Sequence, residues 1–179
     1  GERADGAGLG VRALVKGADG AMRQAVVWLT DTSGPALDEA VERVVAMAKI
    51  APDDPYCGLA DTARLAKEVA DLDLDDHQEP DADTLAKWAE AAEKAALDVD
   101  GVTNSMGAGA GWGRSRVALA TSDGFEGTYS ASSHSVSCSV LAGEGTGMER
   151  DYDYSSARHL SDLDTAEEVG RKAAEKAVK

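Results

Sequence analysis

The stretch "SASSHSVSCSVLAGEG" (130–145) decides how this sequence folds, because its residue types alternate strictly. Every second position is a serine, namely Ser133, Ser135, Ser137 and Ser139. The positions between and after them carry His134, Val136, Cys138 and Val140. Side chains along a β-strand point alternately to its two faces, so we predict a strand with one hydroxyl-lined face and one mostly apolar face.

Strand-like sequence surrounds this stretch from 102 to 158. Two glycine-centred breaks, "DGFEG" (123–127) and "GEGTG" (143–147), interrupt it at short spacing. Such breaks are typical of an antiparallel meander. Near the start of the chain, residues 9–16 and 22–29 are rich in β-branched side chains and flank the turn "GADG". We expect them to form a hairpin.

Three segments carry helix signals. Pro35 and Pro52 bracket the first, over about 34–50, since proline suits a first helical turn and also ends a helix. The second runs from about Asp83 to Leu97, and the third opens at "TAEE" (165–168), a capping box, and continues to the end of the chain. The sequence therefore predicts a single α+β domain over 1–179. Its largely antiparallel sheet, a hairpin plus a C-terminal meander, would pack with about three helices.

Charge and composition exclude several classes of partner. The chain has 179 residues, 43% of them hydrophobic, with 33 Asp and Glu against 18 Lys and Arg. A net charge of −15 repels phosphate backbones and anionic membranes, so we expect neither nucleic acid nor membrane as a direct partner. Apolar runs stay far shorter than the ~20 residues that span a bilayer. Two cysteines in a chain of this length indicate reduced thiols rather than a disulfide framework.

The acidic stretch "DLDLDDHQEPDAD" (71–83) resembles the start of a calcium loop, with Asp71, Asp73 and Asp75 at its first, third and fifth positions. A calcium loop also needs glycine at position six and glutamate at position twelve. Those positions hold Asp76 and Ala82. We therefore interpret the stretch as a solvated acidic loop.

Other groups of reactive residues also lack the spacing that chemistry needs. The glycine run "GAGAGWG" (107–113) leads into another strand rather than a helix, so it does not predict a phosphate site. His134 and Cys138 are four residues apart on a strand, roughly 13 Å, which is too far for a base to activate a thiol. With His77 and His159, the chain's three histidines lie in three different elements. We expect no catalytic residue and no metal ligand in this chain.

The order of several motifs nevertheless resembles a known family. "GVTNS" (101–105), "SHSVSCSV" (133–140) and "GMERDY" (147–152) are its most specific parts, joined by "DPYCGLAD" (54–61) and "SDLDTAEEVGRKAAEKAV" (161–178). Together they resemble the TldD/PmbA family, the modulators of DNA gyrase, from Gly8 to the end of the chain. The "GMERDY" motif is similar to the PmbA (TldE) branch. By this resemblance the chain would be the N-terminal domain of a longer protein.

The resemblance implies a cytoplasmic metallopeptidase that degrades or matures unfolded peptides. In this family TldD-type and PmbA-type chains pair into a heterodimer, and a His-Glu-x-x-x-His helix of the TldD chain holds zinc. That helix lies outside the region that this chain resembles, so we carry over no metal or catalytic residue. We expect a fragment of the non-catalytic subunit, without a cofactor of its own, whose partner is a TldD-type chain or a second copy. Two alternatives stay open: the catalytic, zinc-bearing TldD-type subunit, and a peptide-binding interaction module without hydrolysis.

The serines at the centre of the sequence suggest one candidate surface. A strand face built from Ser133, Ser135, Ser137 and Ser139 is small, polar and uncharged. An extended peptide could lie close to it and be held through its backbone, as in strand addition, with little sequence selectivity. The alternative is a solvent-facing strand on which serine has no binding role.

Overall fold

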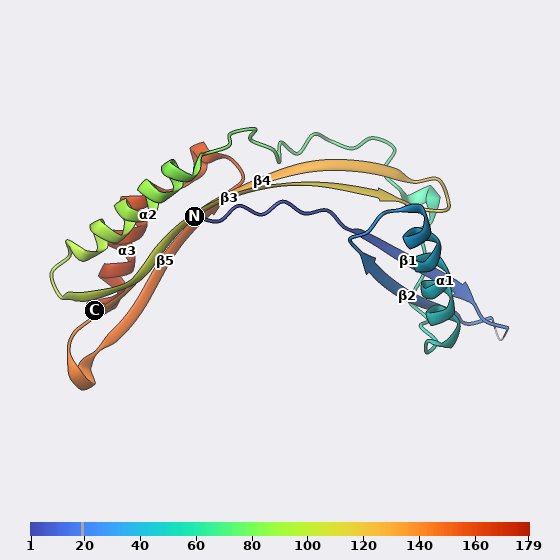
Figure 1. The fold of residues 1–179 in the computed structure, drawn as a ribbon, viewed down its shortest axis with the longest axis horizontal. Helices are drawn as coiled ribbons and strands as arrows, with labels where there is room; N and C mark the ends of the chain where they lie inside the picture. The colour runs from blue at the N-terminus through green and yellow to red at the C-terminus, as the bar shows by residue number, and fades with distance from the viewer. Residues whose placement is uncertain (19) are drawn as a thin grey trace. The chain divides into compact units, whose positions relative to one another are not determined.

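The computed structural model describes residues 1–18 and 20–179 and divides them into two compact units (Figure 1). One unit is Glu2–Glu68, and the other is Val69–Lys179 together with Gly1. We predicted one domain over 1–179, whereas the structure has two units. The division falls within the irregular acidic stretch between the first and second helices.

The smaller unit is a hairpin with a helix packed against it. Strands β1 (Leu9–Lys16) and β2 (Met22–Leu29) pair antiparallel as expected, although the expected turn includes Asp19, which lies outside the described residues. Helix α1 (Gly34–Ile50) has proline in its first turn, as its sequence indicated. Its buried side chains Ala40 and Val44 meet Val27 of β2 and form a core of this unit's own residues.

The larger unit contains a three-stranded antiparallel sheet in the order β3-β4-β5. Its strands are β3 (Val102–Ala120), β4 (Glu126–Ala142) and β5 (Glu149–Ala157). The break at 143–147 falls between β4 and β5, the break at 123–127 begins between β3 and β4 and ends within the first two residues of β4, and the glycine run 107–113 lies inside β3. The meander and the α+β class are therefore confirmed.

Helices α2 (Ala82–Leu97) and α3 (Ala166–Ala177) pack against each other and cover one face of this sheet (Figure 1). Asp81 caps α2 by accepting a hydrogen bond from the Thr84 N–H, and the Thr165–Glu168 capping box that we expected opens α3. Between the helices and the sheet lie small apolar side chains, chiefly Ala92, Ala96, Val136, Cys138, Val140, Val169 and Ala173. Short 3-10 turns occur at Thr62–Arg64, Gly145–Gly147 and Leu160–Asp162. Within 1–18 and 20–179, no helix is long and apolar enough to cross a bilayer.

Candidate functional site

The candidate serines lie on the face of β4 that turns away from the two helices, since the residues between them form the core beneath α2 and α3. Ser133 and Ser137 are exposed, and Ser135 and Ser139 are half-buried. From Ser135 to Ser139, β4 pairs with β3 on one edge and with β5 on the other. A peptide therefore cannot add as a strand along these residues, because the sheet already uses their backbone groups. Contact through the serine side chains stays a prediction.

Neighbouring strands extend this serine surface on both sides. Gly109 and Gly111 of β3 lie opposite Ser137 and Ser135, and Tyr154 and Tyr152 of β5 lie opposite Ser137 and Ser139. The two tyrosine rings stack, with centroids 6.4 Å apart and planes 17° apart. We call this surface the Gly–Ser–Tyr face; its members are Gly109, Gly111, Ser135, Ser137, Ser139, Tyr152 and Tyr154.

This face combines a low, uncharged floor with two exposed aromatic rings. A side chain at Gly111 would begin 3.3 Å from the Ser135 hydroxyl, so glycine there keeps the surface low. Tyr152 and Tyr154 are more than half exposed and supply flat apolar area with a polar tip. We did not include either tyrosine in the candidate surface predicted from the sequence. The alternation in "ERDYDY" (149–154) could have indicated that both lie on one face of a strand.

The opposite face of β4 buries the two reactive residues that the sequence raised. His134 and Cys138 are 0% and 1% exposed. Burial raises the pKa of the Cys138 thiol, and the nearby negative charge of Glu93 raises it further. The thiol therefore stays protonated at neutral pH and behaves as a small apolar side chain.

The acidic stretch does not remain wholly solvated, because residues 73–76 bind the edge of β4 where β5 ends. The Ser132 N–H donates to the Leu74 carbonyl over 2.9 Å, and the Asp76 N–H donates to the Ser132 hydroxyl over 2.9 Å. The Asp76 carboxylate accepts the Leu160 N–H, which holds the pKa of Asp76 below its ordinary value. We call residues 73–76 the crossing segment.

Each of the three histidines lies near a carboxylate of this acidic stretch. Their positions in the sequence did not indicate these contacts. His134 Nε2 lies 3.3 Å from Asp76 Oδ2, without the geometry of a hydrogen bond. His159 Nε2 lies 2.7 Å from the backbone oxygen of Asp73, and this contact raises the pKa of His159.

The third histidine belongs to an ion-pair cluster beside the crossing segment. Arg114 binds the Asp75 carboxylate through Nε and Nη2, and its Nη2 lies 3.0 Å from His77 Nδ1. Within residues 1–18 and 20–179, the second oxygen of Asp75 is buried without a hydrogen-bond partner, as is Trp112 Nε1 on β3. The Arg114–Asp75 ion pair therefore anchors this part of the acidic stretch to β3.

We tested whether these residues suit zinc, the metal that the resemblance implies for the family's catalytic subunit. Across the described ranges, 1–18 and 20–179, no three His, Cys, Asp or Glu side chains gather in a geometry that could hold a metal ion. Each histidine instead faces one carboxylate or carbonyl group of the acidic stretch. The described residues therefore do not fit a zinc site.

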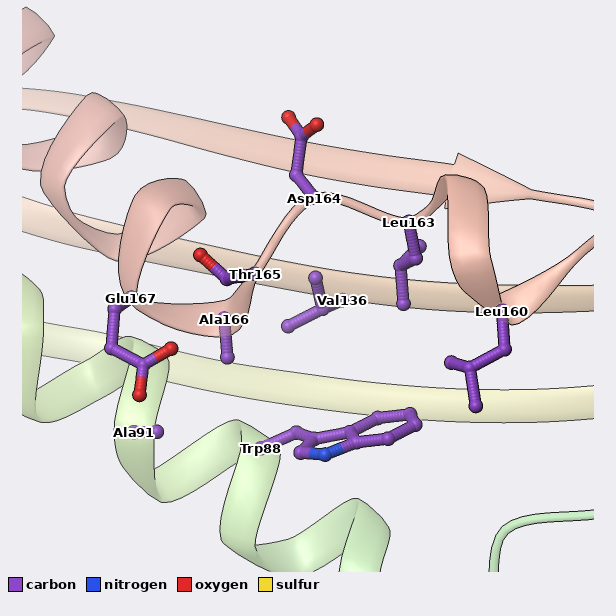
Figure 2. Close-up of a pocket in the computed structure, with 9 residues that line it drawn as sticks. All are labelled: Trp88, Ala91, Val136, Leu160, Leu163, Asp164, Thr165, Ala166 and Glu167. Carbon is purple, nitrogen blue, oxygen red and sulfur yellow. The ribbon is translucent and has the colours of Figure 1, made fainter.

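A pocket of about 290 Å³ lies on the helix-covered side of the larger unit (Figure 2). Trp88 and Ala91 of α2 form one wall, and Leu160, Leu163 and Ala166 lie across from them. Two of the three polar residues at its rim already have partners, because Asp164 pairs with Lys172 and Thr165 belongs to the capping box, and the third is Glu167. The pocket is thus an apolar recess at the seam between helices and sheet.

A larger groove, of about 890 Å³, lies between residues 69–75 and the far end of the β3–β4 hairpin. Its walls are mostly apolar and include Leu72, Leu74, Val117, Leu119, Phe125 and Tyr129. Three carboxylates, Asp71, Asp73 and Asp75, also line it, together with Arg158 and His77. No sequence pattern indicated this groove, because its two walls are about 50 residues apart along the chain.

Comparison with known proteins places this arrangement among relatives. Residues 75–179 match the family model of the PmbA/TldA metallopeptidase central domain. Metalloprotease PmbA of Escherichia coli O157:H7 is 37% identical over 142 residues, which are 79% of this chain and 32% of the relative. A metalloprotease PmbA homolog of Haemophilus influenzae is 35% identical over 150 residues, 83% of this chain and 33% of the relative. The chain thus spans about a third of the length of these curated relatives.

Solved structures share the fold. A candidate modulator of DNA gyrase from Bacteroides thetaiotaomicron superposes with a TM-score of 0.77 at 22% identity, over 95% of this chain and 42% of that one. TldE from Thermococcus kodakarensis gives a TM-score of 0.63 at 18% identity, over 87% of this chain and 35% of that one. At these identities the likeness concerns the fold alone. The family model, however, matches more than half of the chain, and the chain therefore belongs to the PmbA/TldD metallopeptidase family.

Proposed function

We propose that this chain is part of a PmbA-type, non-catalytic subunit of a cytoplasmic metallopeptidase that degrades or matures unfolded peptides. In this proposal a TldD-type partner supplies the zinc and the bond-breaking chemistry, and the two chains act as a heterodimer. The curated relatives support the branch, since both are named as PmbA proteins.

The observation that carries the proposal is the Gly–Ser–Tyr face. Unfolded peptide substrates differ in sequence from one another. A surface that accepts many of them should therefore be low, polar and free of charge. Ser135 and Ser137 supply hydroxyls that donate or accept hydrogen bonds, and the exposed Tyr154 supplies apolar area. In the assembled enzyme this face would form part of the wall along which substrate lies.

Two other functions belong to different classes. In one, the chain belongs to the catalytic, zinc-bearing subunit. In the other, it binds a peptide without cleaving it, in line with the gyrase-modulator description of one structural neighbour. Zinc content and hydrolysis of the separate subunits distinguish the three.

The test uses the full-length protein, alone and mixed with its TldD-type partner, and records hydrolysis of an unstructured peptide together with bound zinc per chain. We expect activity and zinc in the mixture but neither in the lone PmbA-type chain. In the mixture, the double variant Ser135→Lys, Ser137→Lys should lower kcat/KM at least about tenfold, because two long cationic side chains would cover the face.

Two control variants distinguish a loss of binding at the Gly–Ser–Tyr face from general effects of added charge or of substitution. Ser122→Lys adds one lysine, half the charge of the double variant, at an exposed turn outside the face and should leave turnover unchanged. Ser135→Thr, Ser137→Thr keeps both hydroxyls and should retain most activity. If the lysine variant turns over peptide as the wild type does, this face takes no part in catalysis. Zinc and activity in the lone chain would instead assign it to the catalytic subunit.

A further inference from the structure

The edge of β4 is occupied along only part of its length. Strand β5 pairs with β4 from Ala142 back to His134 and reaches no further. The crossing segment covers Ser132, through the bond from the Ser132 N–H to the Leu74 carbonyl. From Glu126 to Ala131, β4 pairs with β3 alone, so among the described residues no strand fills the position that a continued β5 would take.

The backbone direction of β4 at this open edge follows from the Ser132 bond. In an antiparallel sheet, the N–H and C=O of one residue point to the same edge of the strand, and those of the next residue point to the opposite edge. Every second residue therefore faces the same edge. Because the Ser132 N–H points away from β3, the backbone groups of Ser130 and Thr128 point away from β3 as well. Both residues line the 890 Å³ groove. In the described part of the chain, no hydrogen bond reaches the backbone groups of either residue from the groove side.

The groove walls suit a strand with one apolar face. Val117, Leu119 and Tyr129 lie on the same sheet face as the odd-numbered residues of β4, and all three are more than a third exposed. Leu72, on the facing wall, is 68% exposed. Unpaired strand edges with adjacent apolar pockets are the general basis of peptide recognition by strand addition.

Charge selects among extended peptides. The carboxylates of Asp71, Asp73 and Asp75 line the groove together with Arg158. Arg114 neutralises Asp75, so Asp71 and Asp73, whose side chain is 84% exposed, set the negative charge of the wall. Arg158 is already engaged, since it donates to the Ser132 carbonyl over 3.0 Å. A cationic or neutral strand is therefore favoured over an acidic one.

We propose that this groove binds an extended, cationic peptide segment as an added antiparallel strand on β4 at residues 126–131. Residues of the peptide that bond to Thr128 and Ser130 place their side chains on the even-numbered face of β4, whereas the alternate residues place theirs against Leu119 and Tyr129. The site is distinct from the Gly–Ser–Tyr face. This proposal depends on the proposed function in one respect only, namely that the ligand is an unfolded peptide.

The test is direct binding of a fluorescein-labelled hexapeptide of alternating valine and lysine to the full-length protein, followed by fluorescence anisotropy. With the valines against the apolar wall, the lysine N–H groups point toward β4. N-methylation of the lysine residues should weaken binding at least about tenfold, because it removes the backbone hydrogen bonds. N-methylation of the valine residues changes size and polarity equally but should alter binding less than about threefold.

Protein variants supply an independent readout. Leu119→Ala shortens the groove wall and should weaken binding about threefold to tenfold. Met106→Ala is the matched control, since Met106 is also on β3, is 55% exposed and lies outside the groove; its binding should not change.

Several outcomes overturn the proposal: no binding at 1 mM peptide, equal binding of the two N-methylated peptides, or equal effects of Leu119→Ala and Met106→Ala. Concentration-dependent dimerisation that blocks peptide binding would assign the groove to a second copy of the chain. If the assembled enzyme hydrolyses peptide but the N-methylated peptides and the variants do not bind as expected, the groove proposal is wrong and the proposed function stands. If they bind as expected but the assembled enzyme does not hydrolyse peptide, the groove proposal stands and the proposed peptidase role is wrong.

Discussion

Gly170 sets how closely α3 approaches α2. A Cβ atom at this position would lie 2.0 Å from the carbonyl oxygen of Ala92, a separation that real side chains do not reach. Ala92, Val169 and Ala173 are fully buried around the contact. Only a residue without a side chain permits this helix–helix distance, even though glycine weakens the helix itself by roughly 1 kcal/mol relative to alanine.

Gly170→Ala should therefore destabilise the larger unit. We expect the free energy of unfolding to fall by about 1–3 kcal/mol, since overpacking exceeds the gain in helix propensity. Urea unfolding followed by far-UV circular dichroism measures the change. Gly113→Ala is the control, because Gly113 is exposed on β3 with no atom within 4 Å of the added Cβ. Unchanged or increased stability of Gly170→Ala would show that the helices pack less closely.

At the scale of elements, the crossing segment joins the acidic loop to the sheet. Asp73 and His77 at its borders adopt positive φ angles of 48° and 37°, which non-glycine residues rarely do. The bonds of Leu74 and Asp76 to Ser132 hold the chain between them. His159 adds a contact whose strength depends on pH, since the Asp73 backbone oxygen and then the carboxylates of Asp73, Asp76 and Asp162 raise its pKa.

The raised pKa predicts a pH-dependent role for His159. A raised folded-state pKa contributes stability that is complete below the unfolded value, about 6.5, and is lost as pH rises through the folded value. His159→Gln should therefore lower the free energy of unfolding more at about pH 5.5 than at about pH 8.5. Ser122→Gln serves as the control, because Ser122 is exposed and neither side chain is ionisable, so its effect should be the same at both pH values. A difference for His159→Gln that grows toward high pH would contradict the assignment.

At the scale of the whole molecule, the two units have separate cores. The core of the smaller unit consists of Val27, Ala40 and Val44 with their neighbours, all before residue 46. The core of the larger unit lies between Trp88 and Ala177. Since no residue belongs to both cores, loss of packing in one unit should leave the other intact.

Val44→Ala tests this independence. Val44 is 1% exposed, so removal of its methyl groups should destabilise the smaller unit by ~2 kcal/mol. Amide hydrogen exchange, resolved by mass spectrometry, should speed up in α1 and β2 while protection of α2 and α3 stays unchanged. Val169→Ala is the reciprocal variant, with 0% exposure in the other core. Equal loss of protection in both units would mean that the chain unfolds as one body.

Local patterns of the sequence determined most of the secondary structure. Period-two alternation predicted β4, the glycine-centred breaks predicted where the meander turns, and Thr165 with Glu168 predicted the start of α3. These signals act over a few residues, where backbone geometry and capping decide the outcome. We expected the glycine run 107–113 to lead into another strand, whereas pairing with β4 makes the run and the residues after it one strand, β3.

Only the tertiary structure decided which surfaces exist. The sequence alone determined that serines share one face of β4, but whether the edges of that strand were free depended on β3 and β5, which pair with it from elsewhere in the chain. The groove, the crossing segment and the approach of His134 to Asp76 likewise join residues at least 40 positions apart. Such contacts follow from how paired strands and packed helices close the chain on itself, because burial and hydrogen bonding select neighbours in space rather than in sequence.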